Sequence, residues 1–292
     1  RGRANTLRNF ISDGLSTGSS WKQKEIREVL DLCLSCKACT SECPSNVNMT
    51  LLKSEYLHQY YQSRKRPLRD YLFAFNYQLL GRLQGLAPII NFALNRMPGN
   101  RFMKKLLGIA VERTLPELQA KHRPSDHSAF SSQEKNIAIF ADEFTRLYQA
   151  ELLEKFLHLL KQLGYNFHFV RSTESGRAAM SKGFLDYARG CAEKNVEIFY
   201  PHVLEGKTIV GLEPSAILSF REEYPKLVNK NLAEQAEKIS ENTYCFEEWF
   251  FREIQEGQFG SDQFDAVSRN VFYHSHCHQK ALSQTEEALL AL

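Results

Sequence analysis

Four cysteines crowd into eleven residues near the start of the chain, and their spacing constrains this region more than any other feature. Residues 33–44 read C-x-x-C-x-x-C-x-x-x-C-P, with thiols at Cys33, Cys36, Cys39 and Cys43. Runs with this spacing ligate 4Fe-4S clusters, because three thiolates two residues apart can wrap one face of a cube. Zinc would favour two separated pairs of ligands, and disulfides at this density would be unusual without a secretion signal. The sequence therefore predicts that these four cysteines bind iron–sulfur.

The chain contains a single run of this kind, which leaves a ligand set incomplete. In two-cluster ferredoxins the fourth cysteine of each run ligates the other cluster. We therefore expect a partner run upstream of Arg1, and we expect no intact pair of clusters in this chain alone. Residues 286–292 continue a helical pattern without a capping residue, so we also expect the chain to be a piece of a longer polypeptide.

Length, composition and charge are those of an ordinary globular protein. The 292 residues suffice for two domains, and 43% hydrophobic with 24% charged residues excludes a disordered or fibrous chain. The 37 basic and 34 acidic residues nearly balance, so no nucleic-acid partner is expected. No apolar signal segment is visible near Arg1, so secretion is not expected, and no apolar stretch reaches the roughly 20 residues of a membrane span. We expect a cytoplasmic location, with association at the inner face of the membrane left open.

The hydrophobic pattern predicts an α+β multidomain fold. Residues 1–95 predict a helical ferredoxin-like iron–sulfur module. Residues 96–132, rich in basic residues, Pro and Ser, predict a linker with one short helix and a boundary near Ser132. Residues 133–292 alternate short apolar runs with amphipathic stretches, which predicts an α/β domain with a mainly parallel sheet.

The predicted elements of residues 133–292 can be given by position. Strands are expected at 136–140, 166–171, 208–212 and 270–274. Helices are expected at 144–163, 178–195, from 215 onwards, and at 246–255. Cys191 and Cys245 lie among apolar and aromatic neighbours, which predicts buried structural thiols.

The apolar run at residues 70–95 allows two interpretations. One is a pair of helices that packs in a core or between domains. The other is a peripheral helix at a membrane surface, because Arg82, Gln84 and Pro88 exclude a span but allow an interfacial contact.

Residues 32–44, 209–215 and 273–278 together resemble the iron–sulfur portion of large FAD-linked oxidoreductases. These are of the D-lactate and D-2-hydroxyglutarate dehydrogenase type, related to glycolate oxidase iron–sulfur subunits. The resemblance implies FAD on an upstream domain or subunit, two 4Fe-4S clusters in the intact protein, and a following cysteine-rich domain with CCG-type motifs. Residues 1–5 resemble the family segment that directly follows the first cysteine run.

The chain departs from this family pattern at thiol positions of the second domain. Residues 174–177 read Glu-Ser-Gly-Arg in place of a Cys-Cys-Gly-Arg-like sequence, and residues 213–216 read Glu-Pro-Ser-Ala in place of Glu-Pro-Ser-Cys. Cys277 remains, and the last CCG motif would lie beyond Leu292. We therefore expect a thiol-poor domain without an additional cluster.

These segments each follow a predicted strand, which places them at one edge of the sheet. In open parallel sheets ligands lie outside the carboxyl ends of strands, beside helix N-termini. A crevice there would be a redox or cluster-adjacent site, although its residues also suit ordinary loop and capping roles. A third interpretation is that residues 274–278 bind zinc. The alternation of side chains along a strand argues against it, because His276 and Cys277 would then point to opposite faces. The candidate second site comprises Arg177, Glu213, His274, Cys277 and His278.

Two functions remain open. The resemblance implies an electron-transfer segment of an oxidoreductase that oxidises a small 2-hydroxy acid such as D-lactate, D-2-hydroxyglutarate or glycolate. Electrons would leave FAD for the clusters and pass to a quinone or other acceptor, with Lys37 as a local cation that tunes the clusters. No catalytic residue is expected in this chain, and no G-x-G-x-x-G motif follows a predicted strand. The alternative is a non-catalytic iron–sulfur scaffold subunit that docks separate redox partners.

Overall fold

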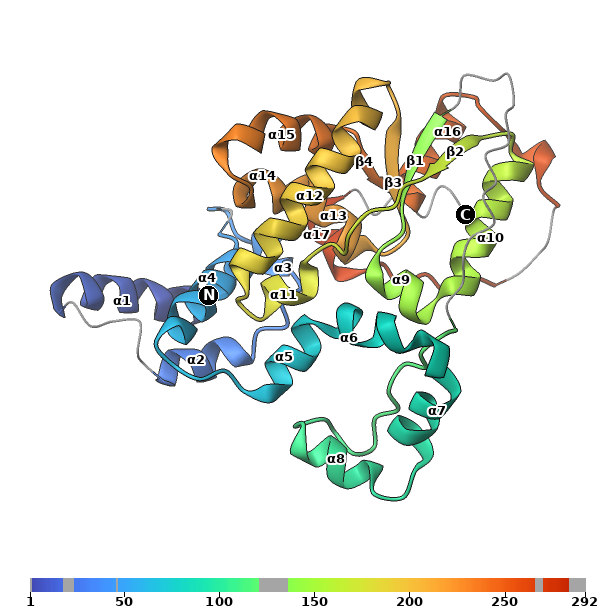
Figure 1. The fold of residues 1–292 in the computed structure, drawn as a ribbon. Helices are drawn as coiled ribbons and strands as arrows, with labels where there is room; N and C mark the ends of the chain where they lie inside the picture. The colour runs from blue at the N-terminus through green and yellow to red at the C-terminus, as the bar shows by residue number, and fades with distance from the viewer. Residues whose placement is uncertain (1, 18–23, 46, 121–135, 266–269, 284–292) are drawn as a thin grey trace.

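The structure is a computed structural model that describes residues 2–17, 24–45, 47–120, 136–265 and 270–283 (Figure 1). The first part of the chain is helical, with one 3₁₀ turn (η2) and one π turn (η3). Its elements are α1 (Gly2–Thr17), α2 (Lys24–Asp31), α3 (Ala38–Glu42), α4 (Met49–Gln62), α5 (Leu68–Ala74), α6 (Asn76–Leu83), η2 (Gln84–Leu86), α7 (Ala87–Asn91), η3 (Phe92–Arg96) and α8 (Asn100–Leu106).

Helices α1, α2 and α4 pack around a small core of their own. Its buried members include Leu7, Ile26, Leu30 and Tyr56. Helix α4 begins after Asn48, whose side-chain oxygen accepts hydrogen bonds from the backbone N–H groups of residues 50 and 51. This cap satisfies two of the amide donors that a helix start leaves without partners.

A parallel sheet organises the second part of the described chain, in the strand order β2-β1-β3-β4. The strands are β1 (Asn136–Phe140), β2 (Asn166–Phe169), β3 (Thr208–Gly211) and β4 (Thr243–Cys245). The helices around them are α9 (Glu143–Tyr148), α10 (Ala150–Gln162), α11 (Arg177–Ser181), α12 (Leu185–Leu204), α13 (Pro214–Glu222), α14 (Tyr224–Leu227), η4 (Lys230–Leu232), α15 (Ala233–Glu241), α16 (Phe246–Gln255), η5 (Ser261–Gln263) and α17 (Cys277–Leu282).

Helices cover both faces of the sheet (Figure 1). Ala138 and Phe140 of β1 pack with α12, α13 and α15, whereas Ile137 and Ile139 pack with α10 and α16. Side chains alternate between the two faces of a strand, and here both faces are apolar because both are buried. Gly211 ends β3, where a Cβ atom would lie 2.7 Å from Cβ of Ile217 and prevent α13 from packing so closely.

The helical part docks against the turn between α11 and α12. Gly183 has a φ of +71° there, and a Cβ on it would lie 2.6 Å from Cβ of Leu57. The guanidinium of Arg66 donates hydrogen bonds to the carbonyls of Lys182 (2.6 Å) and Gly183 (2.7 Å). Only glycine permits both this backbone conformation and so close a contact.

The α+β class and the parallel sheet predicted from the sequence are confirmed, and β1, β2, β3 and α16 lie where they were expected. The ferredoxin-like character of the helical part and the division into two domains stay predictions. The described part of the predicted linker contains α8. The boundary near Ser132, Arg1 and residues 286–292 lie outside the described residues.

The predicted strand at residues 270–274 is wrong. This segment has no regular structure, and its Phe272 side chain is 98% exposed, so apolar composition there does not reflect burial. The fourth strand is instead β4, which is only three residues long. Pairing with β3, from Ile209 opposite Thr243 onwards, defines it as a strand rather than any alternation of its own.

Two predicted helices are also divided. Residues 144–163 form α9 and α10, which meet at Gln149, and residues 178–195 fall into α11 and α12 on either side of Gly183. The apolar run at residues 70–95 is not a helix pair but a series of short helices from α5 to η3. Within the described residues, no helix is both long and apolar enough to cross a membrane.

Candidate functional site

The cysteine segment (residues 32–43) begins after α2, includes α3, and lines a large cavity. Cys33, Cys36 and Cys43 are half-buried, and Cys39 is exposed. All four line one cavity of about 1580 Å³, together with residues of α1 and the start of α4. The structure thus places the predicted iron–sulfur ligands around a common space.

The donor chemistry and the cavity fit a cluster, whereas the thiols themselves are not gathered around one point. In the described ranges of the chain, no three His, Cys, Asp or Glu side chains are grouped closely enough to bind a metal ion. This applies to the cysteine segment and also to residues 274–278, so the zinc interpretation gains no support from the geometry. Iron–sulfur binding by the four cysteines stays a prediction.

The backbone of the cysteine segment is strained. Ser35 (φ +55°) and Lys37 (φ +61°) are the non-glycine residues with positive φ in the described part of the chain. Such left-handed conformations cost on the order of 1–3 kcal/mol and persist where the surroundings enforce them. Both strained residues lie between Cys33 and Cys39, so the surroundings must hold this part of the cysteine run in place.

Hydrogen bonds from distant residues hold this backbone. The carbonyl of Ser35 accepts from Nε2 of His278 (2.8 Å) and from Nη2 of Arg177 (3.2 Å). The carbonyl of Cys33 accepts from Nζ of Lys53 (2.6 Å). Because a carbonyl can only accept, the His278 ring must carry its proton on Nε2.

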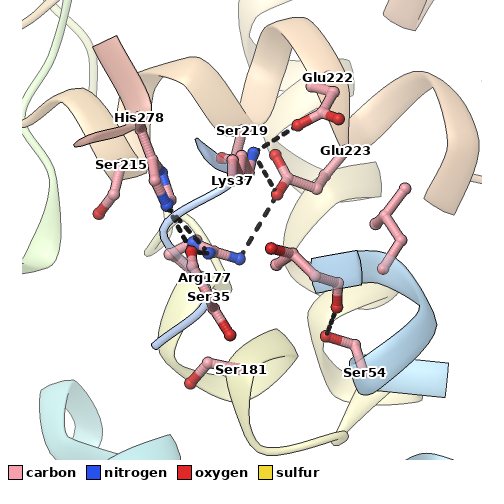
Figure 2. A network of polar contacts seen from close by, with 12 residues as sticks. Ser35, Lys37, Ser54, Arg177, Ser181, Ser215, Ser219, Glu222, Glu223 and His278 are labelled. Atoms are coloured by element: carbon pink, nitrogen blue, oxygen red, sulfur yellow. Dashed lines mark hydrogen bonds and ion pairs between the residues drawn. The ribbon is translucent and has the colours of Figure 1, made fainter. Parts of the chain in front are cut away.

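A buried ion network fixes the segment at a second point (Figure 2). The Lys37 side chain is 1% exposed, and its Nζ lies 2.5 Å from Oε2 of Glu222 and 2.6 Å from Oε1 of Glu223. Glu223 also pairs with Nη1 of Arg177 at 3.4 Å, and Asn48 donates a hydrogen bond to Glu222. A buried charge is tolerated only when it is paired, and here two cations meet two carboxylates.

A second cavity, of about 480 Å³, lies between the cysteine segment and the second half of the chain. It is lined by Cys33, Arg177, Cys277 and His278, among others. Figure 2 shows His278 and Arg177 reaching towards Ser35 from separate elements, α17 and α11. The structure therefore brings three of the predicted second-site residues next to the cysteine segment.

The remaining two second-site residues lie apart from this group. The Glu213 carboxylate caps α13 by accepting hydrogen bonds from the N–H of Ala216 (2.6 Å) and the hydroxyl of Ser215 (2.7 Å), and it lies 3.8 Å from Nε2 of His276. His274 is exposed and does not line this cavity. His278, which does line this cavity, is neutral because burial, followed by the charges of Arg177 and Lys37, lowers its pKa to about 3.

Two acids at the carboxyl edge of the sheet were not expected from the sequence. Asp142 and Glu143 directly follow β1 and are 1% and 3% exposed. Glu143 accepts hydrogen bonds from the backbone N–H (2.8 Å) and hydroxyl (2.6 Å) of Ser175. Burial, followed by the charge of Asp142, raises the pKa of Glu143 to about 8. Burial, followed by the charge of Glu213, raises the pKa of Asp142 to about 6. Their position after a predicted strand was the signal that could have revealed them.

The departures from the family's cysteine pattern have structural counterparts. Ser175 stands where that pattern has a thiol, and its hydroxyl bonds Glu143. Ala216 stands at another such position and is completely buried in the core. Cys191 and Cys245 are buried as predicted. Burial, followed by the charge of Glu174, raises the pKa of Cys191 to about 12, and burial also raises the pKa of Cys245 well above its ordinary value. Neither of these thiols is suited to bind a metal as thiolate.

Comparison with known proteins relates the chain to one class of oxidoreductase, the dehydrogenases. No protein-family model and no solved structure matches the chain. The D-2-hydroxyglutarate dehydrogenase of Pantoea ananatis (strain AJ13355) is 26% identical over 245 residues, which cover 80% of this chain and 23% of that protein. That of Escherichia coli (strain K12) is 27% identical over 252 residues, covering 78% and 25%. The chain therefore spans about a quarter of the length of these curated relatives.

Proposed function

We propose that this chain is the electron-transfer portion of a FAD-linked oxidoreductase that oxidises a small 2-hydroxy acid, with D-2-hydroxyglutarate as the first candidate. One observation carries the proposal: four cysteines with 4Fe-4S spacing line a single cavity in a chain similar to D-2-hydroxyglutarate dehydrogenases. D-lactate and glycolate are the other substrates of this chemical class to be tested.

Cys33, Cys36 and Cys39 would hold one cluster, and Cys43 would ligate a second. A bound 4Fe-4S cluster supplies one-electron transfer, whereas the two-electron oxidation of a hydroxy acid belongs to FAD on the upstream domain or subunit. A quinone or another carrier would receive the electrons.

The residues around the cysteine segment have a mechanical role in this proposal. Lys53, Arg177 and His278 hold the two carbonyls, and the Lys37 network anchors the segment to α13 and the residue after it. Lys37 was expected to act as a local cation. Because its charge is balanced by Glu222 and Glu223, it supports the segment's conformation more than it adds positive potential.

The proposal is tested by Cys36→Ser in the full-length polypeptide, purified without oxygen. We expect lower iron content, loss of the cluster's visible and EPR signals, and electron transfer to an external acceptor reduced by at least about 100-fold. Flavin reduction by D-2-hydroxyglutarate should continue, because that step does not use the cluster. The matched control is Cys191→Ala, which removes a buried thiol and should leave iron content unchanged.

Unchanged iron and turnover in Cys36→Ser would contradict the proposal. A second measurement is iron and sulfide analysis of this chain alone. Two complete clusters contain about eight irons, and we expect far fewer here because the seven cysteines include two that are buried.

A scaffold subunit that docks separate redox partners is the second candidate. The thiol-poor sheet edge favours it, since Ser175 donates a hydrogen bond to Glu143 and Ala216 is buried in the core, where the resemblance would place thiols. A flavin domain encoded in the same reading frame would favour the first function, and separate flavin and iron–sulfur genes would favour the second.

A further inference from the structure

A large share of the exposed apolar side chains gathers in one short part of the sequence. Among the described residues, 20 large hydrophobic side chains are exposed, and 11 of them lie within residues 68–106. On α7, η3 and α8 the most exposed of them are Ile89 (65%), Phe92 (54%), Phe102 (74%) and Leu106 (75%). Figure 1 shows α7 and α8 projecting from the rest of the molecule, away from the sheet. Exposed apolar groups at this density mark an interaction surface.

The same helices carry only positive charge. Residues 71–111 contain no Asp or Glu, although 34 acidic residues occur in the chain. Arg82, Arg96, Arg101 and Lys105 are exposed between the apolar residues. We call this surface the apolar–basic face, and it comprises Arg82, Leu83, Leu86, Ile89, Phe92, Arg96, Met97, Arg101, Phe102, Lys105 and Leu106.

The apolar side chains of this face are not needed to hold the helices in place. Asn91 exchanges two hydrogen bonds with the backbone of Leu118 (2.9 and 2.8 Å), and Asn95 does the same with Leu115 (3.1 and 2.9 Å). Lys104 is buried and donates to the carbonyl of Arg113 (2.8 Å). Polar bonds and a few inner apolar contacts thus anchor the projection, and the outer apolar groups remain available to a partner.

We propose that the apolar–basic face binds the surface of an anionic lipid bilayer, with the apolar side chains in the interfacial region and the Arg and Lys side chains at the headgroups. Interleaved apolar and basic residues, without acidic ones, are the composition that binds such a surface. The uniform sign of the charge is complementary to anionic headgroups. Residues 70–95 also pack as the other interpretation expected, since inner side chains such as Ala74 and Ala87 contact α11 and α9, and this proposal concerns the outer side chains alone. The inference is independent of the proposed electron transfer, since it needs no cluster.

Co-sedimentation of the chain with vesicles tests this inference. We expect strong binding to vesicles of equal parts phosphatidylcholine and phosphatidylglycerol at low salt, and weak binding to phosphatidylcholine alone. Phe102→Ser and Leu106→Ser should each lower the partition constant by about tenfold or more, because each removes a large side chain from the interface. Arg101→Gln and Lys105→Gln should each lower it by about fivefold at low salt, and less at high salt.

Matched controls lie on another part of the surface. Leu204 is 66% exposed at the end of α12, and Lys155 is exposed on α10. Leu204→Ser and Lys155→Gln should leave vesicle binding unchanged, and circular dichroism should show that all variants are folded. The inference is overturned if the anionic vesicles do not bind the chain, or if the controls weaken binding as much as the face variants do. It is also overturned if the face variants abolish only self-association, measured by ultracentrifugation without lipid, because the occupant would then be a second copy.

Discussion

The cysteine segment and the carboxyl edge of the sheet are neighbours, yet they are held in place by different forces. The strands of the sheet are fixed by parallel pairing and by apolar side chains packed on both faces. The cysteine segment has two strained residues, and its main supports are hydrogen bonds and ion pairs to residues far along the chain. Apolar packing of this kind is cooperative and involves no charged group, whereas a polar anchor depends on each partner and its protonation state. The comparison implies that the sheet can stay folded while the segment changes conformation.

The largest effect is expected from Phe199→Ala in the core beneath the sheet. Phe199 is completely buried and packs against Phe140 and Phe220, with ring centroids 5.9 and 5.4 Å away. Its truncation should lower the free energy of unfolding by about 3–5 kcal/mol, because it leaves a cavity. Urea denaturation measures this, followed by tryptophan fluorescence in a Trp21→Phe background that leaves Trp249 as the reporter. Phe272→Ala, at a 98% exposed position, should change stability by less than about 0.5 kcal/mol.

A smaller and more local effect is expected from Lys37→Met. The substitution leaves Glu222 and Glu223 without their main cation, which costs about 3 kcal/mol for a buried pair. Because Ser35 and Lys37 have strained backbone conformations, we expect this loss of stability to loosen the cysteine segment first. The reaction of its thiols with a disulfide reagent should therefore accelerate, while the fluorescence of Trp249, measured in the Trp21→Phe background, stays unchanged. Adding Glu223→Gln to Lys37→Met should restore part of the stability, and equal loss of structure in sheet and segment would argue against separate anchoring.

The most gradual effect concerns pH at the carboxyl edge of the sheet. Because the pKa of Glu143 is raised to about 8, the folded protein binds a proton there that the unfolded chain releases near its ordinary pKa of 4.5. Stability from this group is therefore present at low pH and is lost as pH rises to about 8. The slope is at most about 1.4 kcal/mol per pH unit. Glu143→Gln should flatten the decline measured by urea denaturation between about pH 5 and pH 8, and an unchanged slope would show that Glu143 does not titrate in this range.

The sequence predicted those parts of the fold that local pattern determines. The apolar runs of β1 and β3 were placed correctly because both of their faces are buried. Strand β4 was missed because three residues carry no pattern, and pairing with β3 alone makes them a strand. The approach of Arg177 and His278 to the cysteine segment was expected in outline, although the strand invoked for residues 270–274 does not exist. The contacts of Lys37 with Glu222 and Glu223 were not predictable, since no local rule links residues about 185 positions apart.

The two partners of the Ser35 carbonyl have a consequence for biosynthesis. They lie 142 and 243 residues further along the chain. The four cysteines therefore leave the ribosome long before Arg177 and His278 have been made. Until then the left-handed backbone at Ser35 and Lys37 lacks these two hydrogen bonds, and Lys53 is the near partner that can already hold the segment through the Cys33 carbonyl. Under the proposed function, cluster insertion would therefore follow translation, and these cysteines would have to stay reduced in the interval.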